Sequence, residues 1–316
     1  MGDSFIYWTS IIYAFATASA ICLFLAFYLN KCGNAAAGFA AVPLSIVLSV
    51  ILARFVHWYS RADSYEGFLS AMTVYTHGGY ALIGVFAGCA LSAALLRLIR
   101  LHQSIPMMLD CMCLAGSAGI AVGRLASLYN SSDRGQIIQS IRSLPLVYPV
   151  TNAVSGAQEY RLATFMLQAI IALVIFISLS IFYLRQERHV KDGDTSLLFL
   201  LTYGASQVVL DSTRYDSLYF RSNGFVSIVQ VFSALGLGLA IVLFSIRMVK
   251  AKGFKWWNIP LWIVIAGCIG GAGYMEYYVQ RHGDQALFAY SVMSACLVGV
   301  IALTILIRFL AVKKEK

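Results

Sequence analysis

Nine apolar runs, most of them about 20 residues long, recur along this chain and constrain its fold more than any other feature. A helix of about 20 apolar residues crosses the roughly 30 Å hydrocarbon core of a bilayer. Only 12% of the residues are charged, whereas soluble domains carry about 25%. Because a backbone in lipid must satisfy its own hydrogen bonds, these runs predict an all-α, polytopic transmembrane helical bundle. The runs lie at about residues 6–29, 35–55, 79–99, 107–129, 162–184, 196–212, 225–246, 259–278 and 287–310.

The basic residues predict how these helices are oriented. The odd-numbered runs end toward 14 Lys and Arg residues, including all eight lysines, whereas the opposite side holds 8 arginines. Basic residues in short loops are retained in the cytoplasm, so we expect the N-terminus outside and the C-terminus inside. The first run has no basic segment before it and is expected to be a retained helix, not a signal peptide. The net charge of +9 then faces anionic lipid headgroups and does not indicate nucleic acid.

Loop lengths suggest where function lies. Two longer segments, at about 56–78 and 130–161, fall on the predicted outer side, and we expect irregular chain and binding residues there. After the seventh run, the basic stretch MVKAKGFKWWNIP places Trp256 and Trp257 at headgroup depth. We therefore predict a seven-helix core at 1–250 and a two-helix extension at 251–316.

Arg124 lies within the fourth run, in GRLASLYNSS, where a charged side chain at the centre of a span costs about 3 kcal/mol. On a continuing helix, Arg124, Ser127 and Ser131 would share one face, with Asn130 adjoining. A guanidinium flanked by hydroxyl groups can bind a phosphate through two hydrogen bonds. The alternative is that Arg124 extends to the interface or pairs with a carboxylate from another helix.

A second polar group is QVVLDSTR in the sixth run. Gln207, Asp211 and Arg214 are spaced to share one helical face. Asp211 and Arg214 either neutralise each other or face a substrate.

The segment YTHGGYALIGVFAG begins the third run on the predicted outer side. His77 is a candidate general base, with a solvated interfacial histidine as the alternative. Gly78 and Gly79 allow a lipid headgroup or a neighbouring helix to approach the backbone closely. Arg54, near the outer end of the second run, adds another cation, whereas Asp110 is interpreted as structural because an anion favours a helix N-terminus.

The seven cysteines show no metal-ligand spacing and are interpreted as small packing residues.

The order of these motifs resembles one family, the bacterial prolipoprotein diacylglyceryl transferases. GRLASLYNSSDRG resembles the signature G-R-x-G-N-F-x-N-x-E-x-x-G, with Gly123, Arg124, Asn130 and Gly135 in register. ARFVHWY resembles the family's second-helix arginine segment, GGYALIGVFAG its glycine-rich third helix and MMLD the start of its fourth. LLFLLTYGASQVVLDSTRYD resembles Y-G-x-x-R-x-x-x-E-x-x-R, and GFVSIVQVFS resembles G-x-S-x-x-Q-x-x-S. The resemblance covers about residues 6–246.

The chain also departs from the family pattern. Ser127 and Ser132 stand where the signature has its first Asn and its Glu, and Gln207 stands where the sixth-helix segment has its first Arg. In that segment Asp211 replaces Glu conservatively, and Arg214 matches the family's last Arg. RLATFMLQA keeps Arg161 but loses the family's His-Pro and Tyr-Glu.

The family's His/Tyr position in the third helix falls on Ile83, so the general base is not identified by the resemblance.

The resemblance implies transfer of diacylglycerol from phosphatidylglycerol to the cysteine thiol of a lipoprotein signal peptide, in the bacterial plasma (inner) membrane, with the active face outside. Arg124 would hold the phosphate, assisted by Arg214 or Arg54. The remaining site residues would be Asn130, Gly78, Gly79 and Gly135 for binding and His77 and Asp211 for catalysis. No cofactor or metal is implied.

The main alternative is a non-catalytic relative that binds anionic lipid or lipoprotein signal peptides. A transporter or receptor is less favoured, because charges at midplane in several helices and an internal repeat are not found.

Overall fold

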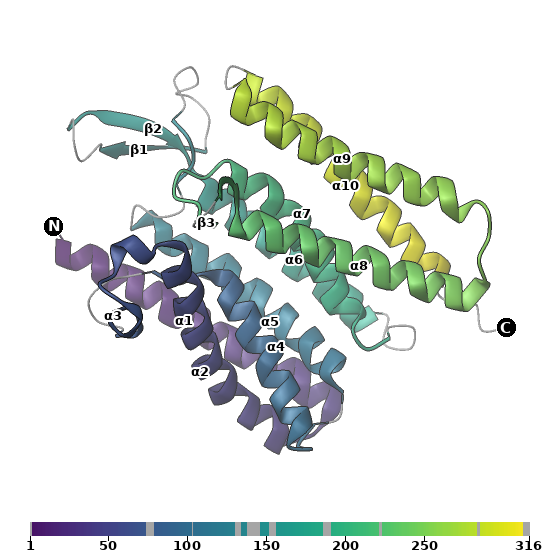
Figure 1. The fold of residues 1–316 in the computed structure, drawn as a ribbon. Coiled ribbons are helices and arrows are strands. Elements are labelled where there is room, and N and C mark those ends of the chain that lie inside the picture. The colour runs from purple at the N-terminus through teal and green to yellow at the C-terminus, as the bar shows by residue number, and fades with distance from the viewer. Residues whose placement is uncertain are drawn as a thin grey trace. The chain divides into compact units, whose positions relative to one another are not determined.

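Each of the nine predicted runs forms a helix in the computed structural model (Figure 1). The structure describes residues 2–73, 79–102, 104–129, 134–137, 146–151, 156–185, 191–220, 223–282 and 285–311. The long helices are α1 (Gly2–Cys32), α2 (Ala35–Ser60), α4 (Leu82–Leu98), α5 (Ile105–Arg124), α6 (Thr164–Arg185), α7 (Asp194–Ser212), α8 (Ile228–Lys252), α9 (Asn258–Arg281) and α10 (Ala286–Ala311).

The polytopic helical bundle is confirmed. Within the described ranges, seven helices are long and apolar enough to cross a membrane, and α4 is a shorter apolar helix. The sixth run, which has the shortest predicted span, forms α7, which is 19 residues long.

The described parts of the segments between the helices contain short helices and strands that the sequence did not predict. The first longer loop contains the short helices η1 (Ala62–Ser64) and α3 (Phe68–Met72). The second contains an antiparallel hairpin of β1 (Val147–Thr151) and β2 (Gln158–Leu162). A smaller hairpin pairs β3 (Tyr219–Phe220) with β4 (Asn223–Ser227), so α8 begins at Ile228 and the predicted start at 225 is wrong. Pairing satisfies backbone groups that lie outside the helices.

The chain forms two compact units. The first comprises residues 1–196 and 213–229, and the second comprises 197–212 and 230–316. The division into a core at 1–250 and an extension at 251–316 remains a prediction. In the first unit, α2 and α5 end, and α4 and α6 begin, at the same end as the β1–β2 hairpin (Figure 1). We call this the hairpin end, and the opposite end, which carries Lys31, the lysine end.

Glycines bring α2 and α4 into backbone contact. A Cβ atom on Gly84 would lie 2.3 Å from the Cα of Ala53, and one on Gly88 would lie 2.5 Å from the Cα of Ser49. These distances exclude any side chain at either glycine, so close approach of a neighbouring helix is their role. The contact places the start of α4 beside the second half of α2, where Arg54 lies.

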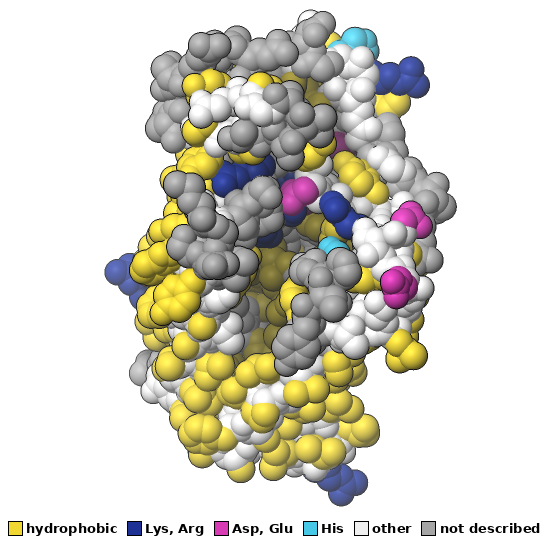
Figure 2. Space-filling view, turned by 90° about the vertical axis from the view of Figure 1, so that its left-hand side faces the viewer, with side chains coloured by type: hydrophobic (Ala, Val, Ile, Leu, Met, Phe, Trp, Pro, Cys, Tyr) yellow, Lys and Arg dark blue, Asp and Glu magenta, His cyan; other side chains and the backbone are white. Residues whose placement is uncertain are grey.

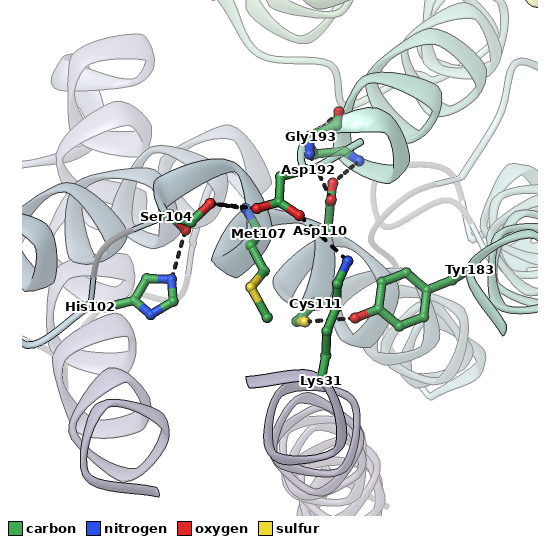
Figure 3. Close-up of polar contacts among 10 residues, drawn as sticks. Lys31, His102, Ser104, Met107, Asp110, Cys111, Tyr183, Asp192 and Gly193 are labelled. Carbon is green, nitrogen blue, oxygen red and sulfur yellow. Dashed lines mark hydrogen bonds and ion pairs between the residues drawn. The ribbon is translucent and has the colours of Figure 1, made fainter. Parts of the chain in front are cut away.

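At the lysine end, Asp110 caps a helix other than its own (Figure 3). Its buried carboxylate accepts hydrogen bonds from the backbone N–H groups of Gly193 and Ser196, each at 2.7 Å. These groups belong to the N-terminus of α7, where backbone N–H groups lack helical partners. The structural interpretation of Asp110 agrees with this geometry, but the helix that it stabilises is α7 and not α5.

The loop before α7 is also held to α1 and α5. Asp192 lies 3.6 Å from Lys31 and accepts a hydrogen bond from the Ser104 hydroxyl at 2.8 Å (Figure 3). The two ring nitrogens of His102 bind the Tyr28 hydroxyl and the Ser104 carbonyl, both at 2.7 Å. The polar groups named here therefore form a hydrogen-bonded network at the lysine end.

In the second unit, α9 and α10 pack as an antiparallel pair through small residues. A Cβ on Gly271 would lie 3.4 Å from the sulfur of Cys296, and one on Gly299 would lie 3.8 Å from that of Cys268. All seven cysteines are free thiols in the described structure; Cys111 is buried and Cys22 is exposed, so the packing role stays a prediction for the set as a whole. Trp262 donates a hydrogen bond to Ser245 at 3.2 Å and so joins α9 to α8.

Candidate functional site

Arginines gather at the hairpin end of the first unit. Figure 2 shows one face on which Lys and Arg side chains lie beside a hollow with hydrophobic walls, together with acidic and histidine side chains. The site is built from the second half of α2, the segment before α4, the end of α5, the β1–β2 hairpin and the chain that follows α7.

Arg54 is the most deeply buried of these arginines, with 2% of its surface exposed. Its Nε donates to the carbonyl of Ala71, and its Nη1 donates to the carbonyl of Gly79 at 2.9 Å. The guanidinium carbon lies 5.2 Å from the centroid of the Tyr65 ring and 5.5 Å from that of Tyr80. Its Nη2 has no hydrogen-bond partner in the described part of the chain. Arg54 is thus a buried cation with one unused donor group.

Gly79 is required for this arrangement. Its φ of +146° is strained for other residues, and a Cβ there would lie 2.2 Å from the His57 ring. The ring is also held by Tyr65, whose hydroxyl lies 2.8 Å from His57 Nδ1. The prediction that Gly79 permits a close approach is confirmed for a neighbouring helix, because His57 of α2 approaches it; the approach of a lipid headgroup stays a prediction.

Gly135 lies where two segments of the chain meet. Its N–H donates to the carbonyl of Leu162 at 2.8 Å, and it forms an isolated bridge with Arg214. A Cβ on Gly135 would lie 2.6 Å from the Cβ of Leu162 and 2.7 Å from the hydroxyl of Thr164. The structure therefore brings together Gly135 and Arg214, two residues that the sequence assigns to the site.

Two further arginines pack around this junction. Arg134 is 6% exposed and donates from Nη2 to the carbonyl of Ser127 at 2.9 Å, with its guanidinium 4.2 Å from the Tyr148 ring centroid. Arg161 forms an ion pair with Glu159 at 2.8 Å and lies 4.4 Å from the centroid of the Tyr215 ring.

The charge of Arg214 is compensated locally. Its Nε and Nη2 both donate to the same carboxylate oxygen of Asp216, at 3.1 and 2.9 Å. Arg61, the residue that follows α2, donates to the backbone carbonyl of Asp216 at 3.3 Å. The Asp216 turn therefore connects the Arg214 junction to the end of the helix that carries Arg54.

The structure corrects the predicted helical face after Arg124. α5 ends at Arg124, which is half-buried, and the chain continues as the tighter helix η2 (Leu125–Leu128). Ser127 is buried, and its backbone carbonyl accepts the hydrogen bond from Arg134. The α-helical spacing that would align Arg124, Ser127 and Ser131 therefore does not continue past Arg124. A cation in the last turn of a helix is also favoured by the helix dipole.

The predicted face of Gln207, Asp211 and Arg214 is also wrong in part. Gln207 and Asp211 are buried in α7, each with 1% of its surface exposed. α7 ends at Ser212, so Arg214 lies beyond the helix and pairs with Asp216. The spacing that places residues on one face holds only within a helix, so it does not place Arg214 on the face of Gln207 and Asp211.

Three predicted site residues, His77, Gly78 and Asn130, lie outside the described residues. Sequence reasoning missed Tyr65, Arg134 and Asp216 as parts of the site. Asp216 follows Arg214 by two residues, so the sequence shows that a carboxylate is near, but it does not show the direction of that side chain.

No group of three His, Cys, Asp or Glu side chains in the described ranges is arranged to hold a metal ion. The hairpin end holds two arginine–carboxylate pairs, Arg161–Glu159 and Arg214–Asp216, and the buried guanidinium of Arg54. A guanidinium of this kind suits an anionic ligand.

Comparisons with known proteins agree with the motif order. The family model of prolipoprotein diacylglyceryl transferases matches residues 1–246. The chain is 25% identical over 206 residues to the phosphatidylglycerol–prolipoprotein diacylglyceryl transferase of Streptococcus mutans, covering 65% of this chain and 77% of the relative. It is 24% identical over 223 residues to the enzyme of the same name from Streptococcus pyogenes serotype M3, covering 70% of this chain and 82% of that relative. Helices α9 and α10 lie outside the family match.

Proposed function

The chain belongs to the prolipoprotein diacylglyceryl transferase family, and we propose that it transfers diacylglycerol from phosphatidylglycerol to the cysteine thiol of a lipoprotein signal peptide. Both substrates are those in the names of the Streptococcus relatives. The proposed site is the hairpin end, which the distribution of basic residues predicts to face outward in the bacterial plasma membrane.

The unused Nη2 group of buried Arg54 carries this proposal. Arg161 and Arg214 each have a carboxylate partner at 2.8 to 2.9 Å, whereas the described partners of Arg54 are two neutral carbonyls and two tyrosine rings. A phosphate oxygen would supply the missing acceptor and the missing negative charge. We therefore assign the phosphate of phosphatidylglycerol to Arg124 and Arg54, and a supporting role to the pair of Arg214 and Asp216.

The proposed reaction needs little covalent chemistry from the protein. The thiol loses its proton, and the sulfur attacks the glyceryl carbon of the diacylglycerol moiety that bears the phosphate ester. A carbon–sulfur bond forms, the carbon–oxygen bond to phosphate breaks, and glycerol phosphate leaves with the electron pair. The protein positions two membrane substrates and stabilises the departing phosphate with fixed cations.

The sequence motifs supply the remaining proposed roles. Asn130, Gly78, Gly79 and Gly135 would shape the lipid site. The catalytic roles given to His77 and Asp211 likewise remain proposals.

Purified protein, labelled phosphatidylglycerol and a peptide containing a lipobox cysteine test the function directly. We expect label to move to the peptide with the wild-type chain, and transfer to fall to background in Arg124→Ala and Arg54→Ala. Arg281→Ala is the matched control, because it removes an exposed arginine from the second unit, and it should transfer label like the wild type.

The replaced family positions Ser127, Ser132 and Gln207 favour a second candidate, a relative that binds anionic lipid without catalysis. Binding of phosphatidylglycerol by the wild type with no transfer to any lipobox peptide would refute the transferase and support this relative.

A further inference from the structure

The proposed reaction requires a group that accepts the thiol proton, because a thiol with a pKa of about 8.5 is mostly protonated at neutral pH. Of the histidines in the described residues, His102 belongs to the lysine-end network, where both of its ring nitrogens have partners. His282 lies in the second unit and stacks on Tyr278 with ring centroids 4.5 Å apart. His57 is the described histidine that lies beside the arginine site.

His57 shares a helix face with Arg54. The two residues are three positions apart in α2, and such residues are neighbours on the helix surface. His57 is half-buried. A thiol that approached His57 would therefore come near the phosphate held by Arg54, which is where the sulfur has to attack.

Two contacts fix the imidazole ring. Gly79 lies so close that any side chain there would overlap the ring, and the Tyr65 hydroxyl lies 2.8 Å from Nδ1. A tyrosine hydroxyl can accept as well as donate a hydrogen bond. When Nδ1–H donates to Tyr65, Nε2 carries the lone pair and can accept a proton. Among the described residues, Nε2 has no hydrogen-bond partner; it lies beside Gly79, where a Cβ would be 2.3 Å from it, so only a glycine leaves this nitrogen uncovered by a side chain.

We propose that His57 is the general base of this chain and takes the thiol proton on Nε2 as the sulfur attacks. This inference rests on the proposed function. The proton moves from sulfur to Nε2, the sulfur electron pair forms the bond to carbon, and the phosphate departs with the electrons of the broken carbon–oxygen bond. Among the described residues, the charged and titratable groups near the ring are Arg54, Arg61 and Tyr65. The bound phosphate offsets the positive charge of the two arginines while the imidazolium forms.

His57→Gln tests the proposal with two peptides that differ in one atom, a lipobox cysteine and the same peptide with selenocysteine. General base catalysis contributes about 10²- to 10⁴-fold to a rate, so kcat for the cysteine peptide should fall by roughly that factor at neutral pH. A selenol is already ionised at neutral pH and needs no base, so the selenocysteine peptide should retain near wild-type kcat. Phosphatidylglycerol binding should change less than about twofold, since Arg54 is retained.

The selenocysteine readout separates a base from a structural residue. If His57→Gln loses activity toward both peptides equally, His57 is structural and the proposal is wrong. If His57→Gln is fully active while His77→Gln shows the selective loss, His77 is the base. Tyr65→Phe should show a smaller, selenocysteine-rescued loss, because it removes the hydrogen bond that orients the ring and keeps the imidazole itself. Failure of the wild type with both peptides would refute the proposed function itself.

Discussion

Replacing Asp110 with alanine should destabilise the first unit strongly, although Asp110 lies at the opposite end from the candidate site. The carboxylate is fully buried and accepts two backbone hydrogen bonds at 2.7 Å, from Gly193 and Ser196. Alanine would leave both N–H groups without an acceptor, and each unsatisfied buried donor costs about 1–3 kcal/mol. Loss of a negative charge at a helix N-terminus adds to this cost. We therefore expect the free energy of unfolding to fall by about 3 kcal/mol.

Asp192→Ala is the matched control. Asp192→Ala removes the same charge from the same end, but the contacts that it removes, with Lys31 at 3.6 Å and with the Ser104 hydroxyl at 2.8 Å, are exposed. Exposed ion pairs contribute up to about 1 kcal/mol, so this variant should lose less than that. Asp110→Asn should be intermediate, because an amide keeps one acceptor oxygen and turns its NH₂ group toward a backbone donor.

Unfolding of each variant in mixed micelles with increasing denaturing detergent measures these differences. Equal stabilities of Asp110→Ala and Asp192→Ala would refute the reasoning, because they would mean that the capping bonds to α7 contribute no more than an exposed ion pair.

Two glycine substitutions test the contacts that form the site. Gly84→Leu should destabilise the protein by about 3 kcal/mol or prevent folding, because its side chain would overlap the backbone of α2. Gly116→Leu, where no atom of a neighbouring element lies within 4 Å, should unfold in denaturing detergent like the wild type. Gly135→Ala should lower transfer by at least about tenfold, because its Cβ would force the signature segment away from β2 and misplace the groups that hold the substrate. Gly224→Ala, also without a neighbour within 4 Å, should leave the transfer assay unchanged.

The helices were predictable from the sequence because the membrane requires a minimum apolar length, which seven of the described helices reach; α4 and α7 are not among these seven. Helix ends were less predictable, because they depend on contacts with other segments. The chain leaves the α-helix at Arg124 and Ser212, where Arg134 binds the η2 backbone and the 134–137 segment pairs with the chain after α7. Neither contact has a signal in the local sequence.

In the candidate site, too, the residues were predictable from the sequence and their contacts were not. Arg54 and Gly79 were selected separately, as a cation and as a close-approach glycine, and the structure shows that the Gly79 carbonyl binds Arg54. The role of Asp216 was missed, because a carboxylate two residues after Arg214 has no fixed direction until the β3–β4 hairpin and Arg61 position the turn. Sequence spacing can identify the charged groups but not which charges cancel one another.

At the hairpin end, Arg161 and Arg214 each pair with a carboxylate, whereas the described partners of Arg54 are carbonyls and tyrosine rings. We therefore expect Arg54 to be the arginine through which an anionic lipid stabilises the protein. A buried guanidinium without a carboxylate is costly, and an anion that binds it stabilises the folded state by mass action, by about 2.7 kcal/mol at 100 times the dissociation constant. Phosphatidylglycerol should therefore raise the stability of the wild type by an amount of this order, whereas the zwitterionic phosphatidylcholine should not. Arg54→Met should lose this gain in stability. The gain is the difference between the stability of one variant with and without phosphatidylglycerol, so the result does not depend on how stable the variant is without lipid. Asp216→Ala should keep the gain, because Arg54 is unchanged. If Arg54→Met kept the full gain, Arg54 would not be a phosphate ligand and the assignment would pass to Arg124 alone.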